Sequence, residues 1–202
     1  MKIKTISSAI IVFLLTLTIS LNAQVSEINN IREIYNSYNL LIEKQGTESN
    51  MELPLKIVTS YTITERAIGP VEYKITFYYD RNETIQTEPY NVSYSNTLRK
   101  IVFSKTSSGT VYKEFLYDSN NKLIFSYIKT SGIWTECSEQ RFYYKEGKLI
   151  RVIFTKDPDE SNTCNAGTRD NKALTSEDIK AGKEVMENAT KFEKIFSQFN
   201  GF

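Results

Sequence analysis

The first hydrophobic pattern along the chain has the period of an α-helix. Between Ser26 and Lys44, apolar residues recur three and four positions apart, which places them on one face of a helix. They are Ile28, Ile31, Tyr35, Tyr38 and Ile42. Gly46 stands where such a helix should end. The spacing therefore predicts an amphipathic helix near the N-terminus.

From residue 57 onward the period changes to two, which is typical of half-buried β-strands. Apolar residues alternate with polar ones from Ile57 to Ile63, and a Gly-Pro turn leads into a second alternating run, Val71 to Tyr79. Further strands are predicted at Leu98 to Lys105, Val111 to Tyr117, Leu123 to Lys129, Trp134 to Tyr144 and Leu149 to Thr155. Short turns separate these runs and favour antiparallel neighbours. Asn82 to Asn96 has no clear period and is interpreted as an edge strand or a loop.

The helical period returns at the C-terminal end. Thr175-Ser176-Glu177-Asp178 resembles a capping box, with Asp as the fourth residue. The apolar positions that follow are Val185, Met186, Ala189, Phe192, Phe196 and Phe199. The order of elements predicts an α+β fold, an antiparallel β-meander of about seven strands packed by an N-terminal and a C-terminal helix.

A weak internal repeat supports the meander. An aromatic, x, Tyr, polar pattern occurs at Phe77 to Asp80, Phe115 to Asp118 and Phe142 to Lys145, and the last two continue into Lys-Leu-Ile. We interpret each unit as one hairpin. The pattern resembles the Tyr-Asp and Gly-Lys-Leu hairpins of β-meander repeat proteins. As a whole, the chain resembles uncharacterised exported bacterial proteins with a helix, meander, helix layout, and this resemblance implies a fold but no assigned reaction.

The N-terminal residues have the composition of a secretory signal. Lys2 and Lys4 precede an apolar run, Ala9 to Leu21, and the small residue Ala23 follows it. The run is too short to span a bilayer comfortably. We therefore expect residues 1–23 to be a signal peptide and residues 24–202 to form a single domain. We expect that domain to be periplasmic or secreted, without stable insertion into a membrane.

Composition narrows the possible functions. Without Lys2 and Lys4, the 25 basic residues fall to 23 against 24 acidic ones, so no charge bias toward nucleic acid is present. The chain has no histidine, which excludes histidine-based triads, imidazole bases and histidine-ligated metals. We therefore expect no enzyme, no cofactor and no metal site.

The two cysteines, Cys137 and Cys164, are expected to pair in an oxidising compartment. The crosslink would stabilise the fold by roughly 3 to 4 kcal/mol in the chain-entropy model.

Aromatic residues are the remaining candidate for function, because the chain has 13 tyrosines and 11 phenylalanines, and tyrosine suits a half-wet surface. Strand parity predicts an aromatic face and, opposite it, an aliphatic face that carries the helices. The aliphatic face comprises Leu116, Ile124, Ile128, Ile150, Val152 and Phe154. The candidate ligand-binding residues on the aromatic face are Phe115, Tyr117, Tyr127, Phe142 and Tyr144. An ordinary half-buried sheet face stays open as the alternative.

These observations favour an exported, non-enzymatic binding or interaction module, whose partner is a glycan, a peptide or a protein. The alternative is a structural protein of the cell envelope or a lipid carrier, in which the sheet and a helical lid enclose an acyl chain.

Overall fold

The computed structural model describes residues 25–45, 54–87, 90–132, 135–155, 168–170 and 174–199. The chain divides into two compact units, Met1–Leu40 and Leu41–Phe202. The expected signal peptide, residues 1–23, lies outside the described residues.

A helix covers residues 25–44. Its buried side chains are Ile28, Ile31 and Tyr38, all of which belong to the predicted apolar stripe. The helical period in this segment is therefore confirmed.

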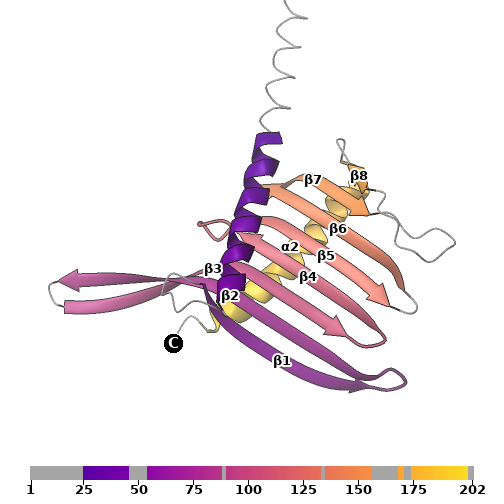
Figure 1. Cartoon of the computed structure of the whole chain (residues 1–202), viewed down its shortest axis with the longest axis horizontal. Coiled ribbons are helices and arrows are strands. Elements are labelled where there is room, and N and C mark those ends of the chain that lie inside the picture. Colours follow the sequence, from indigo (N-terminus) through magenta and orange to yellow (C-terminus); the bar gives the residue numbers. More distant parts are fainter. Residues whose placement is uncertain are drawn as a thin grey trace, which may run out of the picture. The chain divides into compact units, whose positions relative to one another are not determined.

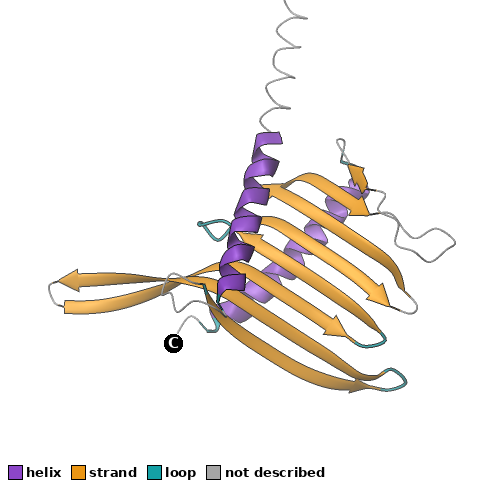
Figure 2. Ribbon diagram, viewed as in Figure 1, coloured by secondary structure: helices purple, strands orange, loops and turns teal. Residues whose placement is uncertain are grey.

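The second unit contains an antiparallel meander in which every strand pairs with the next one along the chain (Figure 1). The strands are β1 (Leu55–Glu65), β2 (Gly69–Thr87), β3 (Tyr90–Thr106), β4 (Gly109–Tyr117), β5 (Leu123–Gly132), β6 (Thr135–Lys145), β7 (Lys148–Thr155) and β8 (Thr168–Asp170). The predicted α+β meander is confirmed, with β8 as an additional short strand. Within the stretch Asn82 to Asn96, the described residues 82–87 and 90–96 belong to long strands, because β2 and β3 stay paired there as a ribbon that projects beyond the other strands (Figure 2).

Helix α2 (Ser176–Ser197) lies diagonally across one face of this sheet (Figure 1). Its N-terminus has the predicted capping box: the Asp178 backbone N–H donates to the Thr175 hydroxyl at 3.1 Å, and the Thr175 N–H donates to the Asp178 carboxylate at 2.9 Å. Two otherwise unpaired backbone donors are thereby satisfied. Among the described helices, none combines the length and the apolar composition needed to cross a bilayer.

Aromatic rings fill the layer between the sheet and α2. The ring centroids of Phe77 and Phe196 are 5.6 Å apart, and those of Phe115 and Phe192 are 5.7 Å apart. The helix lies close to β7 at Gly182, where a Cβ would lie 2.9 Å from Leu149 Cδ2 and the leucine side chain would have to shift. The predicted role of the C-terminal phenylalanines in the core is confirmed.

The sheet has a β-bulge at the equivalent position of each repeat. Register shifts occur at Tyr78/Tyr79, Leu116/Tyr117 and Tyr143/Tyr144. In each case the second strand carries one extra residue, and these residues are Arg99, Ile124 and Ile150. A bulge reverses strand parity beyond it. The three repeats therefore share the same bulge, which is followed by a turn in β4–β5 and β6–β7 and by the projecting ribbon in β2–β3.

Candidate functional site

The predicted aromatic binding face is part of the core. Phe115, Tyr117, Phe142 and Tyr144 are at most 1% exposed, and all four belong to the cluster that packs against α2. A ligand has no access to them. The expectation that these residues form an exposed binding surface is wrong.

The bulges explain the error. Because Ile124 is an extra residue in β5, Phe115 lies opposite Ser126, and Tyr127 lies on the other face of the sheet. The predicted aliphatic face is mixed for the same reason: Val152 is opposite Phe142 and packs with it against α2. Ile128 and Phe154 also pack against that core. The prediction that the helix covers an aliphatic face is therefore also wrong.

Tyr127 is the one predicted site residue that keeps partial exposure, and it lies in a polar network on the face opposite α2. The Arg141 guanidinium lies 5.4 Å from the centroid of its ring. Glu139 pairs with Lys129 at 3.1 Å and with Arg141 at 3.2 Å. Burial, followed by the hydrogen bond and charge of Glu139, raises the pKa of Tyr127 to about 12. Lys129, Glu139 and Arg141 therefore pair with one another within the sheet.

A buried ion pair lies on the same face. Lys100 Nζ is 3.1 Å from the Glu114 carboxylate, and the Tyr112 hydroxyl also donates to Glu114. Burial lowers the pKa of Lys100, although Glu114 opposes this effect. A closed pair of this kind fixes strand packing more readily than it binds a ligand.

On the face that carries α2, Tyr61, Tyr73 and Lys105 stay exposed or half-exposed near the β1–β2 and β3–β4 turns, whereas Phe103 at the border of this region packs against Phe192 of α2. Tyr61, Tyr73 and Lys105 lie directly opposite one another on β1, β2 and β3, and Phe103 lies opposite Lys113 on β3 and β4. We call these five residues the tyrosine–lysine strip. The Tyr61 and Tyr73 rings stack at 4.8 Å with an interplanar angle of 10°, and Tyr61 is 46% exposed.

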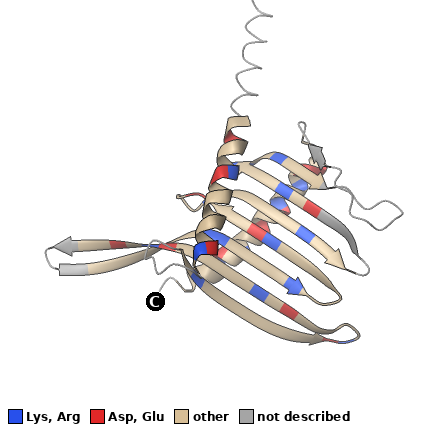
Figure 3. Ribbon diagram, viewed as in Figure 1, with Lys and Arg blue, Asp and Glu red and all other residues tan. Residues whose placement is uncertain are grey.

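The lysines of the strip contact rings rather than carboxylates. Lys105 Nζ lies 5.5 Å from the Tyr73 centroid, and Lys113 Nζ lies 6.0 Å from the Phe103 centroid. Within the described part of the chain, neither has a carboxylate at ion-pair distance. Burial lowers the pKa of Lys113, and the positive charge of Lys191 lowers it further. The strip therefore carries positive charge that no described carboxylate neutralises, although charges of both signs are spread over the sheet (Figure 3).

Sequence analysis could not have located the tyrosine pair of the strip. The β1–β2 turn is centred on Ala67, and Gly69 and Pro70 already pair with β1, so pairing outward from the predicted Gly-Pro turn would not have set Tyr61 beside Tyr73. Their exposure could not have been predicted either, because it depends on the path of α2.

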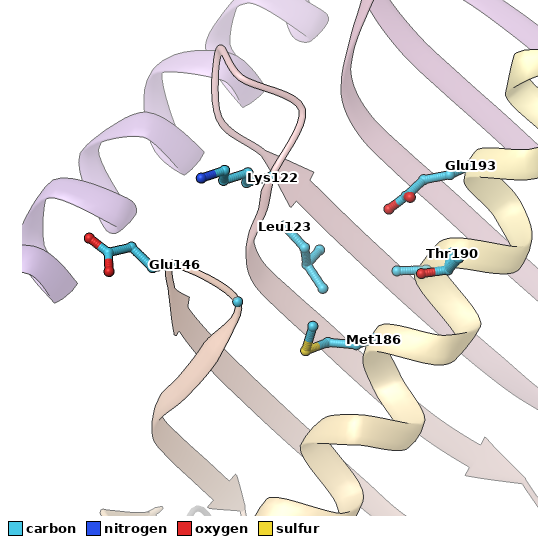
Figure 4. Close-up of a pocket in the computed structure, with 8 residues that line it drawn as sticks. Lys122, Leu123, Glu146, Met186, Thr190 and Glu193 are labelled. Carbon is cyan, nitrogen blue, oxygen red and sulfur yellow. The ribbon is translucent and has the colours of Figure 1, made fainter.

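A pocket of about 330 Å³ lies at the other ends of the strands, between α2 and the turns that join β4 to β5 and β6 to β7 (Figure 4). Its lining residues are Lys122, Leu123, Glu146, Gly147, Met186, Ala189, Thr190 and Glu193. Sequence analysis did not single out any of them as a site residue.

The predicted disulfide stays a prediction. Cys164 lies outside the described residues, as does the side chain of Cys137.

Comparison with known proteins gives no match: the chain fits no known family, and no curated protein or solved structure is significantly similar to it. The candidate site therefore stands on its own geometry.

Proposed function

We propose that the protein is an exported, non-enzymatic binding module that binds an acidic glycan through the tyrosine–lysine strip. The observation that carries the proposal is an exposed tyrosine stack beside lysines that have no carboxylate partner among the residues that the structure describes.

The tyrosines supply the surface for sugar rings. Tyr61 is on the edge strand, so the ring face turned away from Tyr73 has no neighbouring strand in the described sheet. Flat aromatic faces with a polar tip suit the faces of sugars, which are apolar on C–H and polar at the rim. Tyr73 holds Tyr61 in place by stacking, which lowers the entropy lost on binding.

The lysines supply the charge selectivity. Lys105 continues the tyrosine row on the next strand, and Lys113 lies one strand further. A ligand that crosses the strands meets the rings of Tyr61 and Tyr73 and then the Lys105 ammonium group, at intervals of about 4.8 Å, whereas Lys113 lies two residues out of this row. Carboxylated sugars match this order, and their charge also relieves the repulsion between Lys113 and Lys191.

The lipid-carrier alternative has less support. A carrier needs an apolar space between sheet and helix, whereas the rings of Phe77, Phe115 and Phe142 are fully buried in that layer. The other alternative, a structural protein of the cell envelope, is compatible with glycan binding. The two proposals differ only in the partner that the protein binds.

The test is calorimetric titration of the protein with oligogalacturonate and, in parallel, with neutral malto-oligosaccharides of equal length. We expect saturable binding of the acidic chain and at least about fivefold weaker binding by Tyr61→Ala, the cost of losing an aromatic anchor. Tyr94→Ala is the matched control, because Tyr94 is an exposed tyrosine on the projecting β2–β3 ribbon. Equal binding of acidic and neutral chains, or none of either, contradicts the proposal. An acidic peptide that binds while oligogalacturonate does not would assign the strip to a protein partner.

A further inference from the structure

Strand β1 forms one edge of the described sheet (Figure 1). The strands are ordered from β1 to β8, so β1 pairs with β2 on one side and with no described strand on the other. The outward backbone N–H and C=O groups of an edge strand have no partner in the hydrogen-bond ladder of the sheet. Such an edge is a template for pairing with the strand of another chain.

The residues of β1 lack the features that usually protect an edge strand from such pairing. These features are short length, a central charge, a proline or a bulge. β1 has 11 residues without proline, and it pairs with β2 without a shift of register. Its only charged residues, Lys56 and Glu65, lie near its two ends. The edge at β8 is protected by its length of three residues, whereas the edge at β1 is open.

β1 also exposes large apolar side chains. Four of them are between 40% and 49% exposed, and they are Leu55, Val58, Tyr61 and Ile63. The formal net charge of the chain is only +1, so general repulsion between copies is weak. A long, flat and apolar edge strand of this kind predicts association with another strand.

The residue order of β1 fits a second copy of the same strand in antiparallel orientation. Ser60 is the middle residue of β1, so two copies that pair about Ser60 overlap over all 11 residues. This register places Ile57 opposite Ile63 of the second copy, and Val58 opposite its Thr62. β-Branched residues pair favourably across antiparallel strands, so the central part of the joint consists of compatible side chains.

The charges of β1 favour the antiparallel orientation over a parallel one. Lys56 lies near the start of the strand and Glu65 at its end. Each end of an antiparallel joint therefore carries Lys56 of one copy and Glu65 of the other, whereas a parallel joint would bring like charges together. Pairing about Ser60 also sets odd-numbered residues opposite odd-numbered ones, so both copies of α2 would cover the same face of one continuous sheet.

We infer that β1 is a self-association surface, at which two copies of this chain pair antiparallel about Ser60 with two-fold symmetry. The inference rests on the edge strand and does not depend on the proposed function. Tyr61 belongs to both surfaces, and a second copy at β1 would occupy the space beside the ring face that is turned away from Tyr73. A second copy and a sugar stacked on that ring face therefore exclude each other.

The experiment is sedimentation equilibrium of the purified protein over a range of concentrations. We expect a monomer–dimer equilibrium with a dissociation constant on the order of 10 μM, since a joint between two edge strands is a small interface. Hydrogen exchange of the β1 amides should slow as the dimer forms, because the outward N–H groups gain acceptors.

Two double variants test the register of the joint. Val58→Lys, Thr62→Lys places like charges opposite each other, so the dimer should be at least about tenfold weaker. Val58→Glu, Thr62→Lys differs from it at one position, places opposite charges there and should dimerise at least as tightly as the wild type. Both residues are exposed, so we expect the melting temperature of the monomer to stay nearly unchanged in both variants.

Ile85→Lys is the matched control, because Ile85 is an exposed isoleucine on the projecting β2–β3 ribbon and not on β1. It should dimerise like the wild type. The inference is overturned if the protein stays monomeric at every concentration, if Val58→Lys, Thr62→Lys keeps wild-type affinity, or if Ile85→Lys weakens the dimer equally. A monomeric Val58→Glu, Thr62→Lys also overturns it, because opposite charges would then fail to restore the pairing about Ser60.

Discussion

Tyrosine has several distinct environments in this sheet, and they determine what each residue can do. Tyr144 is buried and donates to a helix carbonyl, whereas Tyr117 is buried beside the Glu193 carboxylate. Tyr127 lies in a charged network on the opposite face, and Tyr61 is exposed at the sheet edge. The buried residues Tyr117 and Tyr144 contribute to stability, and the exposed residue Tyr61 is available to a ligand.

This division predicts that truncation of a buried ring lowers stability. Phe115→Ala should lower the free energy of unfolding by about 3 to 5 kcal/mol, because it removes a ring with no exposed surface and leaves a cavity under α2. Urea denaturation measures the change. Tyr94→Ala is the control and should stay within about 0.5 kcal/mol of the wild type, since Tyr94 is 60% exposed. Equal losses in the two variants would mean that Phe115 is not a core residue.

At the scale of elements, the repeat and the cap could be predicted from sequence and the bulges could not. The cap at Thr175 has a signature of residue types at fixed spacing, and so does each hairpin. The extra residues are Arg99, Ile124 and Ile150. Isoleucine is favoured in ordinary strands, so its presence at two of the three positions did not mark a bulge. One undetected residue per hairpin reverses the face of every position beyond it, which moved Tyr127 away from Phe115.

The capping box predicts a local effect on α2. Thr175→Ala should cost about 1 kcal/mol, because it leaves the Asp178 N–H without its acceptor. Chemical denaturation measures the loss in the free energy of unfolding. Faster amide hydrogen exchange in the first turn of α2 shows that the loss arises at this end of the helix. Ser176→Ala changes a neighbouring exposed hydroxyl that has no capping role, and it should leave both quantities nearly unchanged. If Ser176→Ala has the larger effect, the helix does not depend on this cap.

At the scale of the whole molecule, the fold class could be predicted from the hydrophobic period and the order of the elements. The position of the candidate functional surface depends instead on the path of α2 across the sheet. Because α2 crosses the sheet diagonally, it buries the residues that were expected to bind and leaves Tyr61, Tyr73 and Lys105 outside its cover (Figure 1). Neither the composition nor the period of the strands predicts the angle at which α2 crosses the sheet. The same path sets the strip near one end of the strands and the pocket near the other.

The central claim is that the strip recognises an acidic glycan through its lysines, and charge removal tests it most directly. The double variant Lys105→Gln, Lys113→Gln should bind oligogalacturonate at least about tenfold more weakly than the wild type and should lose most of the salt dependence, because the ammonium groups supply the attraction that salt screens. Lys74→Gln is the matched control, since Lys74 is exposed on β2 with its side chain on the opposite face. Calorimetry at low and high salt measures both quantities. The account predicts that Lys74→Gln binds like the wild type; a double variant that keeps wild-type affinity and salt dependence would contradict it.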